Sequence, residues 1–68
     1  MEYLLVKFRE SRPVIIDGHQ QGNTNEVIEL VGGQHTVTLG GKPDFTPTER
    51  TAFIKNTSVV TPHESHFN

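Results

Sequence analysis

Residues 14–22 read Val-Ile-Ile-Asp-Gly-His-Gln-Gln-Gly, and residues 33–39 read Gly-Gln-His-Thr-Val-Thr-Leu. In both stretches β-branched residues meet glycine-containing turns, and the second stretch alternates strictly between polar and apolar side chains. Alternation with a period of two is typical of a strand with one buried face. The two stretches therefore predict a small all-β domain, and neither contains a catalytic motif.

The whole chain has 68 residues, 32% of them hydrophobic, and a formal net charge of −2. This length predicts a single domain over residues 1–68. Ala52 is the only alanine and β-branched residues are frequent, a composition that favours strands over helices. The chain contains no cysteine, which excludes disulfides and thiolate metal sites.

The charge and hydropathy of the chain argue against two classes of partner, nucleic acids and membranes. Lysine and arginine form no cluster, so nucleic-acid binding is not expected. No apolar stretch approaches the roughly 18 residues of a membrane span, and the first residues lack the pattern of a signal peptide. We expect a cytoplasmic location if Met1 is the natural start, or an extracytoplasmic one if an export signal has been removed; the sequence leaves both open.

Alternation and turn residues predict a small antiparallel β-sandwich of five to seven short strands. The strands are expected at residues 2–8, 14–17, 26–30, 34–39 and 50–55, with a last one within 59–67. Residues 18–25 and 40–49 are expected as loops, and Gly32 with Gly33 as a two-residue hairpin turn. An alternative for residues 46–49 is a single helical turn, because threonine before proline resembles a helix cap.

The inward positions of these strands predict the hydrophobic core. Its expected members are Leu4, Val6, Phe8, Val14, Ile16, Ile28, Leu30, Val37, Leu39, Phe45, Phe53 and Ile54. Phe45 lies between two prolines and is expected to fold back over the core. His35 shares the inward parity of Val37 and Leu39, so we expect it in or near the core, hydrogen-bonded to a turn.

Three short motifs follow one another in the order typical of a known family. They are Asp17-Gly18 with Gly22 and Thr24, then Leu30, Gly33, His35, Val37 and Leu39, then Phe45 with Pro47. Over roughly residues 13–47 the chain thereby resembles the PEGA domain, a small all-β module often found as repeats in prokaryotic surface and envelope proteins. It departs from the family pattern at Asn25, Gly32 and Asp44. The resemblance implies a non-catalytic module with carbohydrate or cell-surface association.

The function predicted first is a binding or interaction module that uses no cofactor. The outward row of the strand at 34–39 and the two loops supply the candidate ligand-binding residues, Gln20, Gln34, Thr36, Thr38 and Lys42. Amides and hydroxyls both donate and accept hydrogen bonds, as binding of sugar hydroxyls requires. The expected partner is a polysaccharide or another protein, held by the loops or by an unpaired strand edge. Such an edge also predicts self-association.

Two alternatives stay open beside this function. The first is a structural spacer with no ligand of its own. The second is a metal-binding regulatory protein using His63 and His66, with His19 as a further ligand candidate. Side chains three residues apart point to opposite faces of a strand, and the spacing of His63 and His66 misses the zinc-hydrolase pattern by one residue.

Catalysis is not expected from the sequence. No serine lies in a nucleophile-elbow setting. Glu26 and Glu29 are expected on opposite faces of one strand, where they cannot act together as a glycosidase pair.

Overall fold

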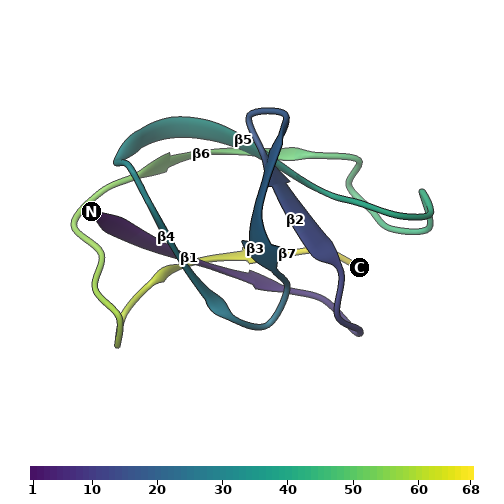
Figure 1. Cartoon of the computed structure of the whole chain (residues 1–68), viewed down its shortest axis with the longest axis horizontal. Helices are drawn as coiled ribbons and strands as arrows, with labels where there is room; N and C mark the ends of the chain where they lie inside the picture. Colours follow the sequence, from purple (N-terminus) through teal and green to yellow (C-terminus); the bar gives the residue numbers. More distant parts are fainter.

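The computed structural model describes all residues, 1–68, and contains strands but no helix (Figure 1). The strands are β1 (Glu2–Lys7), β2 (Pro13–Ile16), β3 (His19–Asn23), β4 (Val27–Leu30), β5 (Gly33–Leu39), β6 (Arg50–Ile54) and β7 (His63–His66). No segment therefore forms a helix of the length and apolar character needed to span a bilayer. The predicted all-β class is confirmed.

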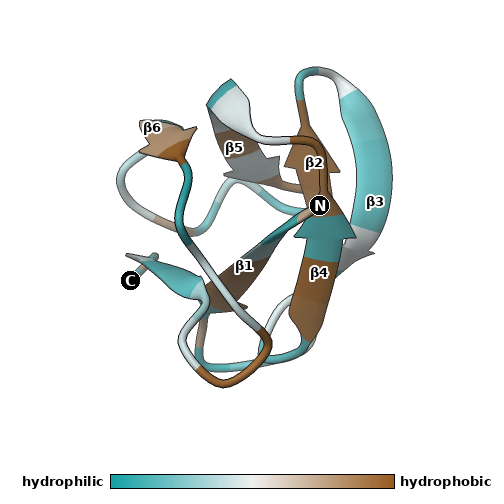
Figure 2. Cartoon of the chain, turned by 90° about the vertical axis from the view of Figure 1, so that its left-hand side faces the viewer, coloured by the Kyte–Doolittle hydropathy of each residue, from teal (hydrophilic) through white to brown (hydrophobic).

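The strands form two packed sheets. One has the order β4-β1-β7 and the other β3-β2-β5-β6. Figure 2 shows the two layers edge-on, with the larger sheet above and β1 and β4 below. Every neighbouring pair is antiparallel except β1 with β7, which is parallel. The prediction of antiparallel pairing throughout is therefore wrong for β7. The chain reaches β7 from the other sheet by the connection at residues 55–62, and no tight hairpin sets its direction.

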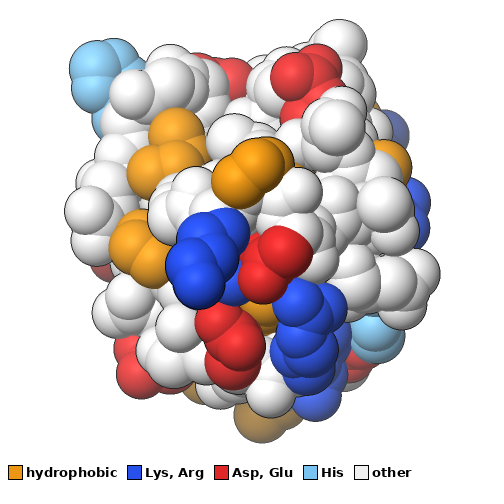
Figure 3. Space-filling view, turned by 90° about the vertical axis from the view of Figure 1, so that its right-hand side faces the viewer, with side chains coloured by type: hydrophobic (Ala, Val, Ile, Leu, Met, Phe, Trp, Pro, Cys, Tyr) orange, Lys and Arg blue, Asp and Glu red, His pale blue; other side chains and the backbone are white.

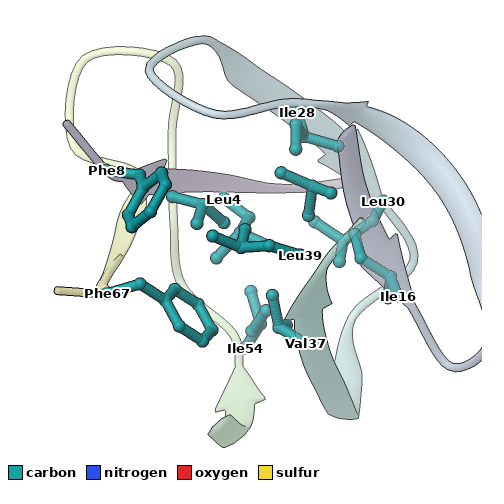
Figure 4. Close-up of a cluster of buried hydrophobic side chains, with 11 residues drawn as sticks. Leu4, Phe8, Ile16, Ile28, Leu30, Val37, Leu39, Ile54 and Phe67 are labelled. Carbon is teal, nitrogen blue, oxygen red and sulfur yellow. The ribbon is translucent and has the colours of Figure 1, made fainter. Parts of the chain in front are cut away.

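The core lies between the sheets and is apolar (Figure 4). Ten of the predicted members are buried, and Phe45 packs against them as the predicted cover. Its ring meets those of Phe8 and Phe67 edge-on, with centroids 6.3 and 5.7 Å apart. Phe67, which the sequence did not place in the core, is only 4% exposed.

Phe53 is the one predicted core residue that lies outside, with 61% of its surface exposed. Neighbouring side chains of a strand point to opposite faces, so Phe53 and Ile54 cannot both face the core. Ile54 is fully buried in the structure. The prediction for Phe53 is therefore wrong.

Residues 18–25, predicted as a loop, contain the strand β3. Asp17 and Gly18 form the turn before β3, Thr24 and Asn25 form a turn after it, and β3 pairs with β2 through its backbone. The prediction failed because β3 is an edge strand whose residues are polar or glycine and do not alternate between buried and exposed. Gly22 allows β3 to approach the other sheet closely, since a Cβ atom there would lie 2.7 Å from Cγ1 of Ile28.

The predicted hairpin at Gly32 and Gly33 is also wrong. β4 pairs with β1, whereas β5 pairs with β2 and β6. The two glycines therefore carry the chain from one sheet to the other. Burial alternation identifies the inward face of each strand, but it does not say which strand lies beside it.

The predicted loop at 40–49 contains no helix, so the alternative of a helical turn at 46–49 is wrong. The Thr46–Pro47 peptide is cis, and Thr46 exchanges two backbone hydrogen bonds with Asn68. The loop is thereby joined to the end of the chain.

Candidate functional site

The outer face of the four-stranded sheet carries most of the predicted ligand-binding residues. Gln34, Thr36 and Thr38 follow one another on the outward side of β5, and the register places them opposite Phe53, Thr51 and Ile15 respectively. Gln20 of β3 pairs with Ile15 and is exposed. Four of the five predicted residues therefore share one face.

Lys42 does not belong to this face. It lies in the loop between β5 and β6, where its carbonyl oxygen accepts a hydrogen bond of 3.2 Å from Nη1 of Arg12. Thr38 is on the face, but its hydroxyl donates to the carbonyl of Thr48 at 2.7 Å. That hydroxyl is engaged in holding the loop, so Thr38 is a weaker ligand candidate than Thr36.

Phe53 is the residue of this face that sequence reasoning missed. Its exposed ring lies beside Gln34 across the strand pair, and Lys55 Nζ is 5.6 Å from the ring centroid. Thr36 and Thr51 form the adjoining pair. We call these four residues, Gln34, Thr36, Thr51 and Phe53, the Phe53 face. Adjacent side chains of a strand point to opposite faces, so the pairing of Phe53 with Ile54 in sequence could have indicated that only one of them is buried.

His35 is on the opposite, inward side of β5, as predicted, with 14% of its side chain exposed. Its Nδ1 lies 2.6 Å from Oδ2 of Asp17, and its Nε2 lies 2.6 Å from the carbonyl oxygen of Val31. The predicted bond to a turn is confirmed, because Asp17 begins the β2–β3 turn. The bonds to Asp17 and Val31 raise the pKa of His35. The pKa of Asp17 is lowered, mainly by the hydrogen bond from the Thr36 amide and next by the hydrogen bond with His35. The bonds of His35 therefore link β5 to the β2–β3 turn and to Val31.

The most strongly bonded charge in the molecule is Arg12, which is 8% exposed. Its guanidinium donates to Glu10 at 2.6 Å, to both carboxylate oxygens of Asp44 at 2.7 and 2.9 Å, and to the carbonyls of Gly40 and Lys42. The Arg12 bond lowers the pKa of Asp44. Figure 3 shows basic and acidic side chains intermixed at this end of the molecule. Because the donors are used internally, this cluster holds the 40–44 loop and offers little to an anion.

The histidines do not gather at a metal site. His63 and His66 lie beside Leu4 and Lys7 of β1, one inward and one outward, and His66 Nε2 is 3.2 Å from Oε1 of Glu64. His19 is on β3, at the far edge of the other sheet. No three His, Cys, Asp or Glu side chains are arranged to hold a metal ion.

A groove of about 570 Å³ separates β6 from β7 on the open side of the sandwich. Its lining is mostly polar and consists of Pro47, Glu49, Arg50, Thr51, Ala52, His63, Glu64, Ser65 and His66. Arg50 crosses it, donating from Nε to the carbonyl oxygen of His66 at 2.6 Å. Figure 2 shows that β6 and the C-terminal end of the chain lie on the same side of the molecule.

Comparison of the chain with protein-family models, curated proteins and solved structures finds no match. The function is therefore inferred from the surfaces of the chain itself.

Proposed function

We propose that this chain is a non-catalytic binding module that holds carbohydrate on the Phe53 face. The exposed aromatic ring of Phe53, directly beside an amide and two threonines on a sheet surface, carries the proposal. An aromatic ring offers a flat apolar surface with little conformational freedom to lose. The C–H face of a sugar ring can pack on it while neighbouring hydroxyls bond to Gln34, Thr36 and Thr51.

The non-catalytic part rests on how the buried polar side chains are used. Arg12 and Thr24 bond to the chain itself, and every buried side-chain nitrogen and oxygen has a partner. Such fully bonded groups stabilise a scaffold. Membership of the PEGA family, with association at a prokaryotic cell surface, is part of the proposal and is supported by the motifs at residues 13–47.

The test is a backbone amide NMR titration of the chain with soluble cell-wall glycans. We expect shifts confined to β5 and β6 around the Phe53 face, and their loss in Phe53→Ala. Val60→Ala is the matched control, because Val60 is also an exposed apolar side chain but belongs to neither strand. Both variants should keep a dispersed spectrum, since truncation of an exposed side chain usually changes stability by no more than about 0.5 kcal/mol.

Two results would argue against the proposal. If the glycan-induced shifts persist in Phe53→Ala, the binding site lies on another surface. A spectrum that no glycan moves would leave the spacer as the better function.

A further inference from the structure

The outer edge of β6 is a second interaction surface, separate from the Phe53 face. β6 is the last strand of its sheet, bonded to β5 on one side and bordered on the other by the groove toward β7. The backbone groups of an edge strand can pair with a strand from another chain. The opposite edge of the sandwich is closed more tightly, where Gly22 of β3 packs on Ile28 of β4.

We infer that β6 pairs antiparallel with β6 of a second copy of this chain, about a twofold axis at Ala52. Residues 49–55 read Glu-Arg-Thr-Ala-Phe-Ile-Lys, and this order supports the register. In this register Glu49 of each copy lies opposite Lys55 of the other, which gives two ion pairs of opposite charge. Both side chains are exposed in the single chain. Opposite charges placed directly across two antiparallel strands stabilise their pairing.

The other side chains of the strand fit the same register. Thr51 lies opposite Phe53 of the second copy, and pairs of an aromatic with a β-branched residue are favourable across strands. Arg50 lies opposite Ile54, so the two arginines do not face each other. Ala52, a small residue, lies at the axis where the two strands meet. Shifting the register by one or two residues removes both Glu49–Lys55 pairs.

The pairing would join the two four-stranded sheets into one continuous sheet. A twofold axis makes the contact closed, so the association stops at a dimer. Both Phe53 rings then lie on the same outer surface. The inference does not depend on the proposed carbohydrate binding, and its test contains no glycan.

The test is sedimentation of the full chain over a range of concentrations, with charge reversals at the two positions. We expect the wild type to show a monomer–dimer equilibrium. Glu49→Lys and Lys55→Glu should each weaken the dimer by about tenfold or more, because two attractive pairs become repulsive. The double variant Glu49→Lys/Lys55→Glu should restore it. Lys42→Glu and Glu26→Lys are matched controls, exposed and outside residues 49–55, and should dimerise as the wild type does.

A mixture of the two single variants is the most specific measurement. One variant carries lysine at both positions and the other glutamate at both, so each should be poor at self-pairing while the mixture forms heterodimers. A wild type that stays monomeric up to about 1 mM would overturn the inference. A dimer insensitive to the reversals, or one that the double variant does not restore, would also overturn it. NMR dispersion of each variant confirms that it is folded.

Discussion

Thr24 shows how a single buried side chain joins two segments of this chain. It is 2% exposed, and its hydroxyl accepts from the Arg12 amide at 2.8 Å and donates to the Glu10 carbonyl at 2.7 Å. The hydroxyl thereby fixes the turn between β1 and β2. Its partners have lost water on folding, and an unpaired buried group is costly.

We expect Thr24→Val to lower the free energy of unfolding by about 1–3 kcal/mol, because valine keeps the shape but leaves both backbone partners unpaired. Denaturant unfolding measures the change. Thr51→Val is the matched control: Thr51 is exposed, and its replacement should change stability by less than about 0.5 kcal/mol. Equal effects of the two substitutions would mean that the Thr24 bonds contribute nothing.

His35 makes stability depend on pH. Its two ring nitrogens face two acceptors, which only the protonated ring can satisfy together. Its folded pKa is raised from 6.5, so its contribution is fully present below that value and is lost as pH rises through the folded pKa. Asp17, with a pKa lowered from 3.8, contributes above 3.8 and loses its contribution as pH falls through its folded pKa.

We therefore expect the stability difference between the wild type and His35→Gln to shrink as pH rises from about 5.5 to about 8.5. Glutamine can donate one hydrogen bond but carries no titrating charge. Denaturant unfolding of both proteins at each pH measures the difference. If the difference is constant over this range, His35 does not bind a proton more tightly in the folded chain.

At the scale of the strand, β3 is held by pairing and close approach, with little burial of its own side chains. Its residues are exposed or half-buried, and its register with β2 shifts between Val14 and Ile15. Gly22 lets its backbone lie against Ile28 of β4. A polar strand of this kind has no alternation to reveal it in a sequence.

The contact predicts that Gly22→Ala lowers the free energy of unfolding by about 1–3 kcal/mol, as overpacking of a close contact typically does. Measurement of Gly22→Ala, Ile28→Ala and the double variant completes a double-mutant cycle. The double variant should cost less than the sum of the single ones, because the second truncation makes room for the new methyl group. Additive costs would show that the close approach is not what requires glycine.

At the scale of the whole molecule, stability rests on one apolar layer between the sheets. Leu39 is 5% exposed in that layer. A domain of about this length buries only about 60% of its unfolded surface, so its stability is small. Leu39→Ala should therefore lower the free energy of unfolding by about 2–5 kcal/mol and leave much of the chain unfolded. A thermal transition like that of the wild type would contradict the burial of Leu39.

Much of the fold could be read from the sequence because it depends on local chemistry. Alternation along residues 34–39 identified the inward faces of Val37 and Leu39, and Asp17 with Gly18 marked a turn that the structure contains. Of the candidate site, Gln34 and Thr36 were found by the same alternation. Phe53 was missed because the prediction gave more weight to its hydrophobic side chain than to its position in the alternation with Ile54.

By itself, the sequence determined the strand class, most of the inward residues and the polar row of β5, since each depends on a period of two along the chain. Only the tertiary structure decided that Gly32 and Gly33 cross between sheets, that β7 runs parallel to β1, and that Phe53 lies beside Gln34. The physical reason is that alternation specifies which side of a strand is buried, whereas strand neighbours are chosen by non-local pairing across the whole chain.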